Sequence, residues 1–260
     1  QDMSDVEQAQ APVALVFDYA SAWGWDVQPQ GQGCDYFRLM FEVYRGLRKL
    51  GLTIDFIPPD TTTLEGFDLV LVPGALTLSA PLKAAIAATP AQVIIGPRTN
   101  AKTHALSVPN PLPPAIPGLD ATVSRVETIR PDMPIAAENG GHVKLWFEQL
   151  ETSDKVIEAT TIGAPILTQS GNLAYLAGWP DEALLQRILT RAATAAGLDV
   201  HSLPRDIRIR DTGKTRFIFN HGDRRDGIPF WVAATQTRAN QYIADFNIRG
   251  VGHINQLKLV

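Results

Sequence analysis

The sequence is poor in the residues that build disulfides and metal sites. Its 260 residues include a single cysteine, Cys34, so neither an internal disulfide nor a site of several thiolates can form. The five histidines are scattered, and no two have the i, i+4 spacing of a helical zinc motif. Walker and GxGxxG phosphate-binding motifs are also missing. We therefore expect neither a metal ion nor a cofactor.

Long apolar runs and concentrated positive charge are missing as well. No run approaches the ~18–20 apolar residues of a transmembrane helix, and the net charge is −4. The densest basic cluster, residues 205–225, is interleaved with aspartates, which is typical of a solvated surface rather than of a nucleic-acid site. The sequence thus predicts no membrane partner and no nucleic-acid partner.

The first residues have the character of a linker. Residues 1–11 contain neither the basic end nor the apolar core of a signal peptide, and they lack an initiating methionine. We therefore interpret residues 1–11 as a linker in a longer protein. A cytoplasmic location is the expectation, although the sequence leaves the location of that longer protein open.

The next hundred residues alternate between short apolar strands and helices. Strands are predicted at residues 12–17, 53–57, 68–72 and 92–95. One helix is predicted between Asp35 and Gly51, which suit its two ends, and another runs from a cap at Ser79 to Ile86. Residues 18–33 are expected to form a polar and aromatic loop. The alternation predicts a doubly wound, mostly parallel α/β sheet.

Beyond this region the pattern changes. A proline-rich stretch within residues 103–118 predicts an extended arm. A helix is predicted from Pro180 to Ala196, with Gly197 ending it. Between the arm and this helix, further strands are predicted at residues 122–129, 143–150, 155–160, 164–168 and 173–178.

After about residue 200 polar and apolar residues alternate with the period of a strand. Residues 207–210 and 215–220 flank the turn sequence Asp211-Thr-Gly, which predicts a hairpin. Further strands are expected at residues 228–235, 241–248 and 253–260. We thus predict an α/β domain over residues 12–200 and a small antiparallel β-domain over residues 201–260.

Cys34 is the one candidate nucleophile of the cysteine type. It precedes a helix, whose N-terminus could stabilise a thiolate, but no sequence feature pairs it with a histidine base. The amidotransferase-like version of this fold places its cysteine in a tight turn after a later strand. The matching place here, residues 96–100, has no cysteine. An incidental Cys34 is favoured, and a free-standing hydrolase that uses Cys34 remains an alternative.

Glu148 is the carboxylate with the most suggestive context. It is followed by glutamine, faintly like the nucleophile of a glycosidase, which needs two carboxyl groups about 5–9.5 Å apart. The Asn-Glu dipeptide typical of the acid/base residue occurs nowhere in the chain. We therefore predict a surface role for Glu148 and no catalytic residue in this chain.

Three aromatic residues, Tyr19, Trp23 and Trp25, are concentrated in the segment after the first strand. Large aromatic side chains are rarely left bare in water. They either pack beneath the loops of their own domain, or contact another domain or subunit, or stack on sugar rings.

The order and spacing of several segments resemble the middle and last domains of family 42 β-galactosidases. The segments that carry this resemblance are residues 13–19, 44–51, 54–58, 68–73, 96–98, 146–150 and 217–221. The resemblance extends over nearly the whole chain from Pro12, and it is weakest over residues 26–33 and over the last sixty residues.

The resemblance implies a scaffold rather than a catalyst. In that family an N-terminal (β/α)8 barrel carries both catalytic glutamates, a middle domain with a class I glutamine amidotransferase-like fold drives trimer formation, and a small β-domain closes the chain. A barrel needs ~250 residues, and none fits before Pro12. The expected partners are the catalytic barrel of the parent chain and two further copies in a homotrimer. A galactoside would be an indirect partner, because Tyr19, Trp23 and Trp25 could border a neighbour's sugar pocket. A carbohydrate-binding module without catalysis is the third reading.

Overall fold

The computed structural model describes most of the chain. The described residues are 11–203, 207–211, 215–220, 234–237, 240–241, 244–248 and 254–259. Most of the predicted linker, the predicted turn after Asp211 and the first part of the predicted strand at 228–235 lie outside the described residues. No helix in the described part of the chain is long and apolar enough to cross a membrane.

A seven-stranded sheet forms the centre of the α/β part, with the order β2-β1-β3-β4-β10-β9-β8. The first five strands in this order are parallel to their neighbours, whereas β9 and β8 are antiparallel. Every residue of β1, β3 and β10 is buried, as expected when both faces of a parallel sheet are covered. The strands are β1 (Val13–Val16), β2 (Ile54–Ile57), β3 (Leu69–Val72), β4 (Gln92–Ile95), β8 (Lys155–Ala159), β9 (Pro165–Ser170) and β10 (Leu173–Leu176).

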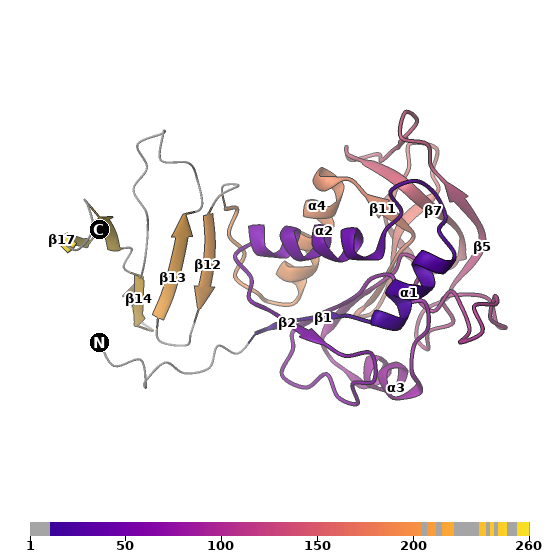
Figure 1. The fold of residues 1–260 in the computed structure, drawn as a ribbon, viewed down its shortest axis with the longest axis horizontal. Helices are drawn as coiled ribbons and strands as arrows, with labels where there is room; N and C mark the ends of the chain where they lie inside the picture. Colours follow the sequence, from indigo (N-terminus) through magenta and orange to yellow (C-terminus); the bar gives the residue numbers. More distant parts are fainter. Residues whose placement is uncertain are drawn as a thin grey trace.

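Four helices flank this sheet, and each begins at a side-chain cap. Asp18, Asp35, Ser79 and Asp181 accept hydrogen bonds from backbone N–H groups of the first turns. In Figure 1, α2 and α4 lie on one side of β1 and β2, and α3 lies on the other. The helices are α1 (Tyr19–Val27), α2 (Tyr36–Lys49), α3 (Ala80–Ala88) and α4 (Glu182–Ala195). The doubly wound fold predicted from the sequence is confirmed.

Two local predictions are wrong. The predicted loop at residues 18–33 contains α1, because the Asp18 carboxylate binds the N–H groups of Ala20 and Ser21 and so starts a helix. Pro180 does not start the last helix of the α/β part. It ends the short strand β11 (Gly178–Pro180), and Asp181 is the cap of α4.

A second, antiparallel sheet lies beside the central one. Strands after residue 118 were predicted from the sequence, but their division between two sheets was not. The order of this second sheet is β11-β7-β5, with β6 also pairing with β7. These strands are β5 (Ala121–Thr128), β6 (Ile135–Ala136) and β7 (His142–Thr152). The proline-rich arm reaches this sheet, since the carbonyl of Pro113 accepts a 2.7 Å hydrogen bond from Val123 N.

The C-terminal strands are antiparallel, as predicted. The hairpin of β12 (Ile207–Asp211) and β13 (Thr215–Asn220) extends to β14 (Ala234–Thr237) and β15 (Asn240–Gln241). A further pair is formed by β16 (Ala244–Ile248) and β17 (Ile254–Leu259). Arg48 of α2 donates a 2.8 Å hydrogen bond to the carbonyl of Ile209. The division into two domains near residue 200 stays a prediction.

Candidate functional site

A tight turn follows β4 at the place where the amidotransferase-like fold carries its nucleophile. Gly96, Arg98 and Asn100 all have positive φ, at 98°, 56° and 54°. A positive φ is uncommon for a residue with a side chain and marks a position held by its surroundings. The turn is held by Thr99, whose hydroxyl donates a 2.6 Å hydrogen bond to the carbonyl of Val72. Arg98 lies within this turn, and residues 96–100 include no cysteine.

The guanidinium of Arg98 contacts two indole rings. Its Cζ is 4.0 Å from the ring centroid of Trp25 and 5.0 Å from that of Trp146. Arg98 is only 2% exposed, and burial lowers its pKa to about 10, with Glu148 offsetting part of the effect. Cation–π contacts of this kind stabilise a desolvated guanidinium by about 2 kcal/mol.

Glu148 lies directly beneath this turn and is fully engaged in hydrogen bonds. Its Oε1 accepts from Arg98 N at 3.0 Å and from Trp146 Nε1 at 3.1 Å, and its Oε2 accepts from the Tyr175 hydroxyl at 2.7 Å. Burial raises the pKa of Glu148, and these hydrogen bonds and the positive charge of Arg98 offset only part of that rise.

The predicted surface role for Glu148 is therefore wrong. Regular alternation along β7 is interrupted at Leu145, whose φ is 63°, and the next three residues are all buried. The carboxyl group can fix the turn that carries Arg98. Its hydrogen-bond partners among the described residues are an indole, a phenol and a backbone amide, and none of them is a carboxylate.

Exposed aromatic side chains, together with the partly buried Phe17, gather where β1 and β2 end and where α1 and α2 begin. We call Phe17, Tyr19, Trp23, Phe37, Phe41 and Phe56 the aromatic surface. The Phe17 ring centroid is 4.8 Å from that of Tyr19 and 5.7 Å from that of Phe37. A hollow of about 670 Å³ lies beside these rings, bordered also by Pro58 and Pro59.

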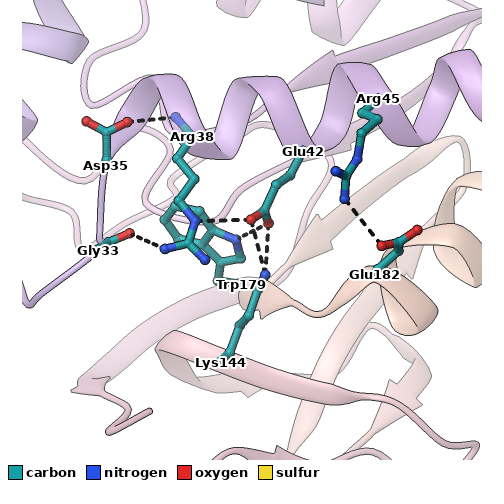
Figure 2. Close-up of polar contacts among 8 residues, drawn as sticks. All are labelled: Gly33, Asp35, Arg38, Glu42, Arg45, Lys144, Trp179 and Glu182. Carbon is teal, nitrogen blue, oxygen red and sulfur yellow. Dashed lines mark hydrogen bonds and ion pairs between the residues drawn. The ribbon is translucent and has the colours of Figure 1, made fainter. Parts of the chain in front are cut away.

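The opposite side of α2 is fixed to the protein by charge (Figure 2). Glu42 accepts hydrogen bonds from Trp179 Nε1 at 2.8 Å, from Lys144 Nζ at 3.0 Å and from Arg38 Nε at 3.1 Å. Burial alone raises the pKa of Glu42, but these three donors outweigh it, so the pKa lies below its ordinary value. This network orients α2 over β7 and β11, and Phe37 and Phe41 are exposed elsewhere on the same helix.

Residues 11–199 match the family model described as the β-galactosidase trimerisation domain. The chain belongs to this family. A β-galactosidase of Thermus thermophilus is 38% identical over 221 residues, which are 82% of this chain and 34% of that protein. The β-galactosidase structure from Marinomonas ef1 is 30% identical with a TM-score of 0.80, covering 84% of this chain and 34% of that one. The family resemblance expected from the sequence is confirmed.

A more distant structure supports the fold alone. The β-galactosidase of Halorubrum lacusprofundi superposes with a TM-score of 0.81 at 23% identity, over 90% of this chain and 41% of that one. The chain spans about a third of the length of the curated Thermus relatives that it matches.

Within this trimerisation domain, α1 separates the three predicted contact residues. Tyr19 and Trp23 are 62% and 67% exposed, and as an i, i+4 pair they share one helix face. Trp25 is only 1% exposed, and its Nε1 donates a 2.9 Å hydrogen bond to the carbonyl of Gly74. The prediction of an intermolecular contact is corrected for Trp25, because a helix turns through about 200° over two residues and directs this side chain inward.

Cys34 is not set up as a nucleophile. Its side chain is buried, and its Sγ donates to the carbonyl of Leu145 at 3.7 Å. Burial raises the pKa of Cys34, and the positive charges of Arg98 and Arg38 offset only part of that rise. In the part of the chain that the structure describes, His142 pairs with Asp181 and His201 pairs with Asp199, and neither pair includes the thiol.

From the sequence, the turn after β4 was considered only as a possible position for a catalytic cysteine. The buried arginine at this turn, Arg98, was therefore not predicted as a site residue. The available signal was Gly96-Pro-Arg98 itself, a turn sequence after a buried strand with a charged residue at its apex. Among the residues with described positions, no group of three or more potential metal ligands is present.

Proposed function

We propose that this chain is the assembly portion of a β-galactosidase, in which it holds three subunits together and contributes no catalytic carboxylate pair. Hydrolysis of terminal β-D-galactosides would belong to a separate catalytic barrel of the parent protein. The family match supports assembly, since the matched domain is described as a trimerisation domain. The observation that carries the proposal is the aromatic surface.

The aromatic surface has the composition of an interface. Tyr19 and Trp23 extend along α1, and Phe37 and Phe41, at 50% and 59% exposure, extend along α2. The Tyr19 and Phe37 ring centroids are 6.5 Å apart, so the two rows are continuous. Aromatic residues are enriched at protein interfaces, whereas contiguous exposed apolar patches are uncommon on monomers.

The proposed occupant of this surface is a second copy of the chain. A cyclic trimer forms when one patch contacts a different patch on the next subunit, three times around an axis. Binding to the barrel of the parent chain is the competing use of the same surface. In either arrangement Tyr19 and Trp23 could approach a neighbour's galactoside pocket without contributing to its chemistry.

Sedimentation of the chain and of two variants tests the proposal. We expect the wild type to sediment as a trimer of the 28.3 kDa chain and the Tyr19→Ala/Trp23→Ala double variant to sediment as a monomer with an unchanged circular dichroism spectrum. Ile162→Ala is the matched control, because Ile162 is 86% exposed on another part of the molecule. A monomeric wild type, or a double variant that remains trimeric, contradicts assembly through this surface.

Two activity measurements test the absence of catalysis. The purified chain should release no nitrophenol from a nitrophenyl β-galactoside, and hydrolysis that persists after removal of host enzyme would contradict the proposal. Cys34 should react slowly with a thiol reagent near neutral pH, because the thiol is buried and held protonated. Rapid modification would favour the alternative hydrolase.

A further inference from the structure

A small hollow lies beside Arg98, and three further segments line it together with Gln30 and the turn after β4. The proline-rich arm contributes Val108, Leu112 and Pro113, and β5 contributes residues 123–126. The third wall is formed by Trp146 and Glu148 of β7. The volume is about 230 Å³, which is below the range of ≈ 300–1,000 Å³ found for drug-sized ligands. The hollow therefore suits a molecule of only a few heavy atoms.

Arg98 lines this hollow, and one nitrogen of its guanidinium has no hydrogen-bond partner. Its backbone N–H binds Glu148, but Nη1 of its guanidinium is buried without a hydrogen-bond partner. The guanidinium carbon lies 4.0 Å from the ring centroid of Trp25 and 5.0 Å from that of Trp146, and these contacts leave the N–H groups at its planar edge as the donors for an acceptor. An edge of this kind matches a carboxylate, which accepts two parallel N–H···O bonds in one plane.

Three basic side chains and one acidic side chain, that of Glu148, line the hollow, and this excess of positive charge favours an anion. Lys102 lines it together with Arg98, and both are cationic. Arg125 also lines it, although this residue is paired with Glu127 at 3.4 Å. The carboxyl group of Glu148 accepts hydrogen bonds from the backbone N–H of Arg98, from Trp146 and from Tyr175, and none of these joins it to the guanidinium.

We propose that this hollow binds a small aliphatic carboxylate. The carboxylate accepts hydrogen bonds from the edge of Arg98, and Lys102 attracts it or a second acidic group at the mouth. The apolar stem of the ligand packs against Val123 and Leu112. This site is separate from the aromatic surface, so it does not depend on the proposed assembly function.

Equilibrium dialysis with radiolabelled glutarate tests the proposal on the full chain at constant ionic strength. We expect saturable binding that unlabelled glutarate displaces and glutaramide, its uncharged analogue, does not. Binding should quench or shift the tryptophan fluorescence, because Trp25 and Trp146 cover the guanidinium. Unsaturable binding, or equal displacement by glutaramide, overturns the proposal.

Three variants distinguish this site from general attraction of anions. Arg98→Met should weaken glutarate binding about tenfold or more, because it removes the charge-assisted donors. Lys102→Ala keeps the hydrogen bond from the backbone N–H of Lys102 to the carbonyl of Leu76, so the buried turn should stay intact. This variant should weaken glutarate binding severalfold. Lys155→Ala, an exposed control on β8, should leave it unchanged. Equal affinities of the Lys102 and Lys155 variants, or full affinity in a folded Arg98→Met, overturn the assignment.

Discussion

The hydroxyl of Tyr175 donates a 2.7 Å hydrogen bond to Oε2 of Glu148, and both side chains are closed to solvent. Tyr175 belongs to the central sheet and Glu148 to the antiparallel sheet beside it. The same carboxyl group binds the backbone N–H of Arg98. One buried acid thus joins the two sheets to the turn after β4.

Tyr175→Phe should test this connection. The substitution keeps the ring but leaves one oxygen of a buried carboxyl group without its donor, which costs about 1–3 kcal/mol of unfolding free energy. Urea denaturation followed by fluorescence measures the loss. Tyr19→Phe is the matched control, since its exposed hydroxyl should contribute less than about 0.5 kcal/mol. Equal effects of the two substitutions would show that the buried hydrogen bond is not important.

Glu148 also predicts a pH dependence of stability. Its pKa is raised in the folded state above the ordinary value of 4.5, so its contribution is fully present below that value and is lost as pH rises through the folded pKa. Glu148→Gln cannot ionise. Relative to the wild type, this variant should therefore gain stability as pH rises from 4.5 through the raised pKa of Glu148. Denaturant midpoints across this interval measure the difference, and a difference independent of pH contradicts the prediction.

For Glu42 we expect a pH dependence of stability opposite to that of Glu148. Its folded pKa is lowered, so the stability that it contributes is present above the ordinary value of 4.5 and is lost as pH falls through the folded pKa. Glu42→Gln weakens the hydrogen bonds from Lys144, Arg38 and Trp179 and should cost about 1–3 kcal/mol near pH 7. The same denaturation experiments should find this loss smaller near pH 3. A loss that grows on acidification is the contrary result.

Short-range signals explain which parts of the fold the sequence could predict. Asp35 and Ser79 were recognised as helix caps because their hydrogen bonds reach only three residues along the chain. The helix α1 was missed because Asp18 is followed by aromatic residues and by Gly24, which are weak helix formers.

The candidate site depends on long-range packing, and the sequence could not supply it. Glu148 is buried because Tyr175 lies against it from another sheet, and Arg98 is enclosed by indoles from α1 and β7. A side-chain pattern along β7 gives no sign of these partners. The positive φ of Leu145 also interrupts the alternation on which the surface prediction depended.

Trp23 and Trp25 should respond differently to replacement by alanine. Trp25→Ala removes a buried indole together with its hydrogen bond to Gly74 and its contact with Arg98, which should cost about 3–5 kcal/mol. Trp23→Ala truncates an exposed side chain and should change the stability of the subunit by less than about 0.5 kcal/mol. Chemical denaturation of both variants in the Tyr19→Ala background separates the stability of the subunit from its assembly. Similar losses of unfolding free energy for Trp23→Ala and Trp25→Ala would contradict the burial of Trp25 and the exposure of Trp23.

Gly96 should be among the most sensitive glycines, because its surroundings as well as its φ exclude a side chain. A Cβ at this position would lie 2.3 Å from the carbonyl oxygen of Leu176, so backbone must move. Gly163 is the matched control: its φ is 84°, but a Cβ there meets nothing within 4 Å. Gly163→Ala therefore tests backbone strain alone and should cost about 1–2 kcal/mol. Gly96→Ala adds a steric clash to that strain and should cost more than about 4 kcal/mol. Thermal and urea denaturation compare the two variants.

Because Gly96 begins the turn that holds Arg98, a folded Gly96→Ala variant should also lose glutarate binding, whereas Gly163→Ala should retain it. Equal losses of unfolding free energy in the two variants would mean that Leu176 of β10 can move away from the turn with little loss of stability. That result would contradict the close contact between Gly96 and Leu176.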